Sequence, residues 1–172
     1  MPSKKVSSAD NQQERPEIAW WISGFVDGEG CFSVSINRNS TTRFGWQVFP
    51  EFVVTQGEKS RSSLEVLKKH FGCGSIYINR RHDNHSEALL RYCVRNRTEL
   101  AERIIPFFNA YPLKTAKKDD FVIFIKIIDK MNQGKHLTKE GLANIARLIQ
   151  TMNRKVPSRF LESSETKRRI PT

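Results

Sequence analysis

Cysteine is scarce in this chain of 172 residues, which has only three, at positions 31, 73 and 93. An odd, widely spaced set does not suit the disulfide framework that stabilises small secreted domains. We therefore expect reduced thiols in a reducing compartment. A zinc site is also disfavoured, because a predicted strand separates the two pairs with zinc-like spacing, His70–Cys73 and His82–His85.

Long apolar runs are missing as well. No segment approaches the roughly 20 apolar residues needed to span a bilayer, and the polar first fifteen residues contain no apolar signal core. Secretion and membrane insertion are therefore disfavoured. The glycine-rich loop that binds phosphates in nucleotide-binding proteins is also missing, so the sequence does not imply ATP.

Acidic residues are outnumbered, with 18 Asp and Glu against 29 Lys and Arg, which gives a net charge of +11 and a pI near 9.9. This excess favours a polyanionic partner, nucleic acid above all. The length suits one domain. We divide the chain into a disordered leader (1–15), a single domain (16–152) and a mobile basic tail (153–172).

The most informative stretch is 16–31, PEIAWWISGFVDGEGC. Pro16 suits the first turn of a helix, and an apolar run continues that helix. Ser23 and Gly24 interrupt the run, although a glycine inside a helix costs about 1 kcal/mol relative to alanine. Close approach of another helix backbone would compensate for this cost. The helix is expected to end at 27–30, DGEG, with two carboxylates at its terminus.

Residues 22–30, ISGFVDGEG, resemble the nine-residue motif that names the LAGLIDADG homing endonucleases. Asp27 and Glu29 occupy the places of its two acidic residues, with Glu29 in place of the commoner aspartate. The motif occurs once, so the resemblance implies a homodimer in which two motif helices pack together. The dimer-interface residues that it implies are Trp20, Ser23, Gly24 and Asp27.

Hydrophobic periodicity predicts the order α-β-β-α-β-β-α, followed by further helices. Strands are expected over 31–39, 46–56, 75–80 and 88–96, and helices over 58–71, 98–108, 115–131 and 137–152. Pro50 suggests that the second strand lies at an edge or carries a bulge. The order matches the family's α+β core from about Glu17 to Asp129. That core is a saddle-shaped antiparallel four-stranded sheet covered by helices on one side, here with C-terminal helices added.

Polar side chains alternate along the predicted strands and would occupy the open face of the sheet. Such groups bond base edges in a major groove, which admits a two-stranded ribbon. A solvated face would also be polar, so it is the motif and the net charge that favour DNA. The residues expected to face bases are Ser33, Ser35, Asn37, Asn39, Gln47, Glu51, Thr55, Ser75, Tyr77, Asn79, Arg91 and Arg95. Those expected to hold phosphates are Arg38, Arg43, Arg80, Arg81 and Arg97.

Phosphodiester hydrolysis needs a positioned water and stabilisation of the phosphate charge, which divalent metals held by carboxylates supply. Two Glu29 carboxylates brought together at a dyad would repel unless a cation lay beside them, and Mg²⁺ suits such oxygen ligands. By resemblance, Glu29 and the backbone carbonyl of Gly28 bind the metal, and Asp27 braces the helix ends.

The resemblance implies two further catalytic residues. Gln56, at the end of the second strand, matches a polar residue that orients water in the family. Lys117 matches a basic residue near the cleaved phosphate, with Lys114 and Lys118 as alternatives.

The sequence therefore predicts a homodimeric, Mg²⁺-dependent homing endonuclease encoded in an intron of the group I type. It would hydrolyse both strands of a pseudo-palindromic site of roughly 20 base pairs and leave a staggered cut. Two alternatives use the same scaffold: an intron-RNA splicing helper, or maturase, and a non-cleaving DNA-binding regulator. The expected location is the bacterial cytoplasm, or the mitochondrion or chloroplast for an organelle gene, since an Arg- and Ser-rich import leader is missing.

Overall fold

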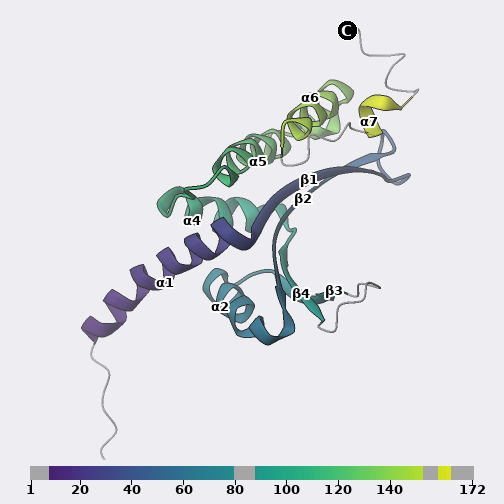
Figure 1. Ribbon diagram of the computed structural model, residues 1–172. Helices are drawn as coiled ribbons and strands as arrows, with labels where there is room; N and C mark the ends of the chain where they lie inside the picture. Colours follow the sequence, from purple (N-terminus) through teal and green to yellow (C-terminus); the bar gives the residue numbers. More distant parts are fainter. Residues whose placement is uncertain (1–7, 80–87, 153–158, 164–172) are drawn as a thin grey trace, which may run out of the picture.

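The computed structural model describes residues 8–79, 88–152 and 159–163 (Figure 1). Its elements are α1 (Ser8–Glu29), β1 (Gly30–Arg38), β2 (Trp46–Gly57), η1 (Glu58–Ser60), α2 (Arg61–Phe71), β3 (Ser75–Asn79), β4 (Leu89–Val94), α3 (Arg97–Glu99), η2 (Leu100–Ile104), α4 (Ile105–Ala110), α5 (Lys117–Asn132), η3 (Lys135–Leu137), α6 (Lys139–Gln150) and α7 (Arg159–Glu162). The predicted α+β order is confirmed. In the described part of the chain, no helix is long and apolar enough to cross a membrane.

Helix α1 passes directly into strand β1 at Gly30. The helix begins at Ser8, two turns before Pro16, where its first turn was expected. A Cβ atom on Gly30 would lie 2.6 Å from Val26 Cγ1 and 2.8 Å from the Val26 carbonyl oxygen. The residue that follows Glu29 must therefore be glycine for the chain to turn this tightly from helix to strand.

The four strands form one antiparallel sheet in the order β1-β2-β4-β3. Strand β2 lies between β1 and β4, so it is not an edge strand over its whole length, and its continuous register with β1 has no bulge at Pro50. The proline is tolerated because β4 pairs with β2 only over 52–57, and Pro50, opposite Val34, has only β1 beside it among the described strands.

Helices cover one face of the sheet, on the convex side of the curved β1–β2 hairpin in Figure 1. Phe32 lies at the centre of this covered face, fully buried, with its ring 5.1 Å from that of Phe52 and 4.9 Å from that of Phe121. Side chains of opposite parity point to the other face, which none of the described helices covers. Ile78, on edge strand β3, is 61% exposed although it has the parity of the covered face.

Asn96 caps the helical segment that follows β4, which was predicted to begin at residue 98. Its side-chain Oδ1 accepts hydrogen bonds from the backbone N–H groups of Thr98, at 2.9 Å, and Glu99, at 3.2 Å. Asparagine is as good a cap as serine or threonine, so the helix begins one residue earlier than expected.

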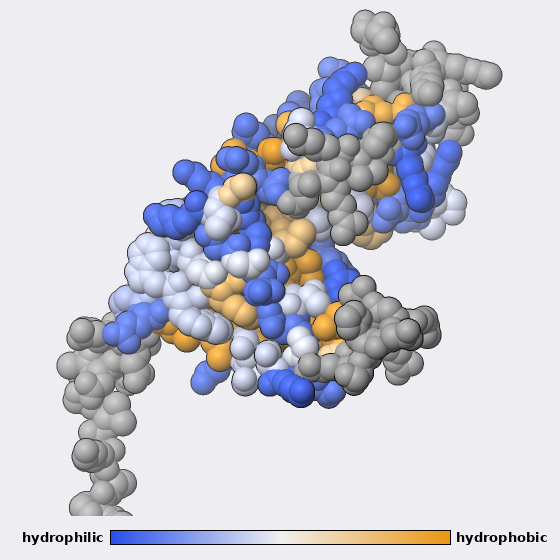
Figure 2. All heavy atoms as spheres, in the orientation of Figure 1, coloured by the Kyte–Doolittle hydropathy of each residue, from blue (hydrophilic) through white to orange (hydrophobic). Residues whose placement is uncertain are grey.

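The last elements pack against the far end of the hairpin. Helix α6 buries Leu142 and Ile145, while hydrophilic side chains cover much of the visible surface over α5 and α6 in Figure 2. Within the expected basic tail, Arg159–Glu162 instead forms helix α7, whose buried Phe160 meets the Trp46 ring edge-on at 5.4 Å. The domain therefore includes an aromatic contact made by residues beyond 152.

Candidate active site at the end of helix α1

The carboxylate of Asp27 joins the end of α1 to the segment that leads into α5. It accepts hydrogen bonds from the backbone N–H of Lys114, at 2.7 Å, and from the N–H and hydroxyl of Thr115, at 3.0 and 2.6 Å. These three hydrogen bonds link residues that are 87 and 88 positions apart in the chain. Asp27 thus braces the helix end, as the resemblance implied.

These contacts decide the protonation of Asp27. Partial burial acts to raise the pKa of the carboxyl, but the hydrogen bonds from Thr115 and Lys114 and the charge of Lys117 together lower it below its usual value. Donors aimed at a carboxylate stabilise its ionised form. Asp27 is therefore a fixed anion whose oxygen atoms already have partners.

Lys117, the first residue of α5, reaches back to the end of α1. Its ammonium donates to the carbonyl oxygens of Val26, at 2.9 Å, and Asp27, at 2.8 Å. Helix C-termini leave carbonyls without intrahelical partners and carry partial negative charge, so an ammonium is stabilising there. An ammonium has three N–H donors, and these two contacts leave one for another ligand.

The surroundings of Lys117 act on the pKa of its ammonium in opposite directions. Desolvation lowers the pKa of the ammonium, while Asp27, Cys31, Glu29 and Asp120 act in the opposite direction. Glu29 is thus near enough to interact with this cation. By contrast, the hydrogen bond from Lys114 to Asp27 is donated by the backbone N–H of Lys114. Lys118 likewise donates its backbone N–H to the carbonyl of Thr115.

Glu29 and Gly28 form the exposed tip of the same helix. The β1–β2 register pairs Gly30 with Val54, so β2 continues past the start of β1 alongside the tip of α1. Gln56, which is opposite Leu90 on β4, lies two residues further along this continuation. The predicted catalytic residues Glu29, Gln56 and Lys117 therefore come from three elements that meet at one end of the sheet.

The outer face of α1 is apolar and unobstructed. Trp20 is 51% exposed and Trp21 42% exposed, and a Cβ atom added to Gly24 or Gly28 would meet no described atom within 4 Å other than its chain neighbours and the backbone of its own helix. Nothing in the described chain requires glycine at these two positions. Their small size suits close approach by something outside the protomer.

Ser23 does not belong to this outer face. Its side chain is only 4% exposed, and its hydroxyl donates to the Tyr111 carbonyl at 2.9 Å. The dimer-interface role expected for Ser23 is therefore wrong in physical terms, because the residue joins α1 to the protomer's own loop after α4.

A metal ion would have few protein ligands in one protomer. The described residues contain no cluster of three or more His, Cys, Asp or Glu side chains that could hold an ion. Glu29 and the Gly28 carbonyl are hard oxygen donors at an exposed position, which fits Mg²⁺ with water, phosphate or a second chain completing its coordination.

The open face of the sheet carries most of the residues predicted to face bases. The register places Ser33 opposite Glu51, Asn37 opposite Gln47, and Thr55, Arg91 and Tyr77 in one row across three strands. Ser35, Ser75 and Asn79 have the same parity. The alternation predicted from the sequence thus places these polar residues on one face of the sheet.

Comparison with known proteins identifies the scaffold. The sequence model of the family described as LAGLIDADG endonuclease matches residues 22–128, which include the end of α1, the whole sheet and most of α5. The chain belongs to the LAGLIDADG endonuclease family. The resemblance seen in residues 22–30 is confirmed.

Named relatives of this LAGLIDADG chain include intron-encoded proteins. "Probable intron-encoded endonuclease 3" of Neurospora crassa is 33% identical over 135 residues, which are 78% of this chain and 24% of the relative. DNA endonuclease I-CeuI of Chlamydomonas moewusii is 29% identical over 82% of this chain and 64% of its own length. The chain spans about a quarter of the length of the first curated relatives it matches.

Solved structures of the family share the fold. The homing endonuclease I-TnaI is 40% identical with a TM-score of 0.76, over 86% of this chain and 95% of that one. I-SmaMI bound to an uncleaved DNA target in the presence of calcium ions is 34% identical with a TM-score of 0.75, over 84% of this chain and 47% of that one. The predicted α+β architecture is that of LAGLIDADG endonucleases.

Several residues predicted to bind DNA also have partners within this LAGLIDADG chain. Glu51 bonds Arg91 and Arg95, the Arg38 guanidinium lies 4.3 Å from the Trp46 ring centroid, and Arg97 donates to the Met131 carbonyl at 3.0 Å. Arg97 therefore helps to hold the C-terminal turn of α5. Arg80 and Arg81 lie outside the described residues.

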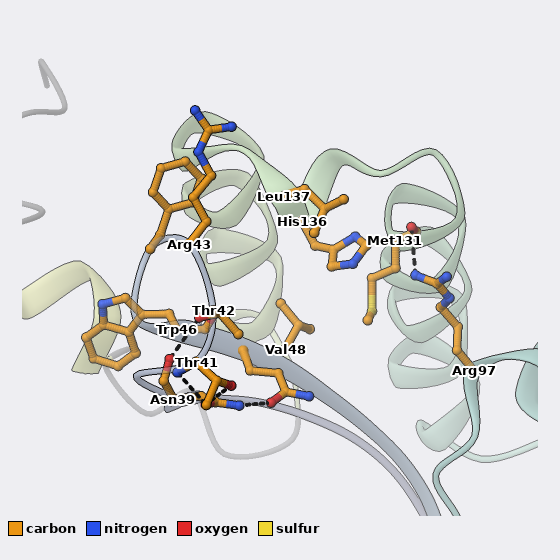
Figure 3. A pocket seen from close by; sticks show the side chains of 12 residues that line it. Asn39, Thr41, Thr42, Arg43, Trp46, Val48, Arg97, Met131, His136 and Leu137 are labelled. Carbon is orange, nitrogen blue, oxygen red and sulfur yellow. Dashed lines mark hydrogen bonds between the residues drawn. The ribbon is translucent and has the colours of Figure 1, made fainter.

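A hollow of about 660 Å³ separates the hairpin tip from the end of α5 (Figure 3). Asn39 lies at its edge, donating to Gln47 Oε1 and accepting from the Thr41 N–H at 3.0 Å, so it organises the hairpin turn. Arg43 extends away from the hollow, with its guanidinium 5.3 Å from the Phe44 ring. These residues place the hairpin tip far along the sheet from the Glu29 end.

Phe49 lies on the open face of the sheet but was not among the residues predicted to contact DNA. It is 40% exposed and lies opposite Ser35. The alternation Gln47, Phe49, Glu51 places Phe49 on this face, but a prediction restricted to polar side chains omits it. An apolar side chain on this face is suited to contact a thymine methyl group.

Proposed function

We propose that this LAGLIDADG chain is a homing endonuclease that acts as a homodimer and cuts both strands of a long, pseudo-palindromic DNA site. The observation that carries the proposal is the exposed Glu29 carboxylate at the tip of α1, beside a helix face where a Cβ added to Gly24 or Gly28 would meet nothing in the described chain outside its own helix. Two such faces packed about a dyad bring two Glu29 carboxylates together.

The lengths of related chains support a dimer. This chain matches 95% of I-TnaI but 47% of I-SmaMI, so two copies of it correspond to one I-SmaMI chain. In the dimer, Gly24 would allow the two helix backbones to approach, and Trp20, Trp21 and Gly28 would border the contact. Aromatic residues of this kind are enriched at protein interfaces.

DNA recognition is proposed for the open face of the sheet. I-SmaMI and I-CpaMI have been solved with DNA targets, and the net charge of +11 favours the same partner here. A strand of about nine residues covers about nine base pairs, so a dimer would read roughly 20.

The residues around Glu29 suit metal-assisted hydrolysis. Glu29 and the Gly28 carbonyl would hold Mg²⁺, which when bound polarises the phosphate and lowers the pKa of water. The free donor of Lys117 would contact the scissile phosphate, since its other two hold the end of α1. Gln56 would orient the attacking water. Asp27, with its oxygens already bonded, keeps the tip in place.

The names of the relatives support an intron-encoded gene. A group I intron remains our prediction, as does the bacterial cytoplasm, or the mitochondrion or chloroplast, as the compartment of action.

A randomised duplex library tests this function. Purified protein is incubated with the library in Mg²⁺, in parallel with the Glu29→Gln variant and with Ca²⁺ replacing Mg²⁺. We expect staggered cuts at one enriched pseudo-palindromic site, lost in Glu29→Gln although that variant still binds. Binding without cutting by the wild-type protein would indicate a regulator instead. Enrichment of structured intron RNA in place of duplex would indicate a splicing helper.

A further inference from the structure

Two arginines on the open face of the sheet converge on one carboxylate. Glu51, in β2, accepts from Arg91 Nη2 at 2.7 Å through Oε1 and from Arg95 Nε at 2.5 Å through Oε2. Arg91 belongs to β4, and Arg95 directly follows it. Both carboxylate oxygens of Glu51 thus accept hydrogen bonds from arginines in β4 or directly after it.

The exposed fractions show which of these groups a ligand would meet. The Glu51 side chain is 18% exposed, against 32% for Arg91 and 54% for Arg95. In the exposed Arg61–Glu65 pair on α2, by contrast, the two partners differ little in exposure, at 53% and 48%. The guanidinium groups therefore lie over Glu51 and face outward, and Glu51 is shielded from bases.

Arg95 is fixed from a second direction. Its guanidinium carbon lies 5.6 Å from the centroid of the Tyr77 ring, on strand β3. Because Glu51 takes the Nε–H, the two Nη groups remain available as a fork of parallel donors. Such a fork matches guanine O6 and N7 in the major groove. A side chain already held in place loses less conformational entropy on binding.

We propose that Glu51 and Tyr77 are positioning residues that hold Arg95, with Arg91 beside it, to read guanine at neighbouring base pairs of the target. Two guanidinium groups on one carboxylate are close enough to address base pairs separated by one or two steps of about 3.4 Å. The proposal rests on the proposed DNA-binding function and assigns Glu51 a role other than direct contact with bases.

The test begins with the wild-type protein. Duplexes that it binds in Ca²⁺ are selected from a random library, and each enriched guanine is then replaced by 7-deazaguanine, which lacks the N7 acceptor. We expect replacement at one or two neighbouring positions to weaken binding about tenfold. Arg95→Met should bind the normal and the modified duplex almost equally at one of these positions, because the methionine side chain has no N–H group to donate to N7.

The role of Glu51 is tested by Glu51→Gln, with Glu65→Gln as the matched control. Glu51→Gln should reduce the 7-deazaguanine penalty at those positions to less than about threefold while phosphate-driven affinity persists, and Glu65→Gln should leave the penalty unchanged. Tyr77→Leu provides a second variant, expected to reduce the same penalty, in case Glu51→Gln does not fold.

The possible failures are distinguishable. A wild-type protein that enriches no duplex would overturn the proposed function together with this inference. Enrichment without a 7-deazaguanine penalty would overturn only the reading of guanine. A full penalty in folded Glu51→Gln and Tyr77→Leu would show that Arg95 needs no positioning.

Discussion

The ammonium of Lys117 lies 2.8 Å from the carbonyl oxygen of Asp27, and the carboxylate of Asp27 accepts the backbone N–H of Thr115, two residues before that lysine. The end of α1 and the start of α5 therefore hold each other in both directions. Glu29, two residues beyond Asp27, is exposed at a tip that these bonds keep in place.

This relationship predicts that Lys117 supports stability as well as cleavage. Lys117→Met removes a charged donor from two carbonyls at a helix end and should lower the free energy of unfolding by about 1–3 kcal/mol. Urea unfolding followed by circular dichroism measures the change. Lys118→Met, at the exposed neighbouring position, should stay within about 0.5 kcal/mol of the wild type. Equal stability of the two variants would contradict the account.

Much of this arrangement could be predicted from the sequence, because local patterns determine it. The motif marked the end of α1, and period-two alternation gave the face of Ser33, Asn37 and Tyr77. Both depend on neighbours in the chain. The role of Ser23 was missed because its partner, the Tyr111 carbonyl, lies 88 residues away. The sequence pattern was the same whether Ser23 faced a second chain or its own.

The placement of Glu51 was missed for a similar reason. Alternation correctly put it on the open face, but only the pairing of β2 with β4 shows that Arg91 and Arg95 occupy its oxygens. Phe160 was assigned to a tail because its stretch is short and basic, and its contact with Trp46 is tertiary. The sequence predicted most helices and strands, but it did not predict which side chains far apart in the chain would contact one another.

A substitution at Gly24 should affect the protomer and the dimer in opposite directions. Gly24→Ala adds a methyl group that meets nothing in the described chain outside its own helix and should stabilise α1 by up to about 1 kcal/mol. The same methyl group would separate two packed helix backbones and weaken the dimer by about 1–3 kcal/mol. Sedimentation velocity across a concentration series measures the dimer, and dilute thermal unfolding measures the protomer.

The control for Gly24→Ala is Val122→Lys, which changes an exposed apolar residue on α5. It should leave the oligomeric state unchanged. If Gly24→Ala dimerised as well as the wild type, the outer face of α1 would not be the dimer contact.

The environment of His136 leads us to expect a loss of stability in mild acid. Burial, followed by the nearby charge of Arg97, lowers the pKa of this histidine, despite an opposing contribution from the Met131 carbonyl, and its Nδ1 is buried without a hydrogen-bond partner in the described structure (Figure 3). The unfolded chain, with a histidine pKa near 6.5, therefore binds more protons than the folded one. Stability present above about pH 6.5 is lost as the pH falls toward the lower folded value.

Urea unfolding at fixed protein concentration, at pH 7.5 and pH 5.5, measures this loss. His136→Gln should reduce the difference in unfolding free energy between the two pH values. His70→Gln is the matched comparison, because burial also lowers the pKa of His70. Because the pKa of Asp27 is lowered, its contribution to the pH dependence of stability falls below the range from pH 5.5 to pH 7.5. An unchanged pH dependence in His136→Gln would show that the histidine is protonated in both states alike.

The most direct measurement is strand-resolved cleavage of one enriched duplex in Mg²⁺ by the wild type, Glu29→Gln and the exposed-glutamate control Glu140→Gln. The account predicts that the wild type and Glu140→Gln cut both strands, while Glu29→Gln binds with similar affinity and cuts neither, with a rate at least about 100-fold lower. Cleavage of both strands by Glu29→Gln at the wild-type rate would contradict the assignment of the active site to the tip of α1.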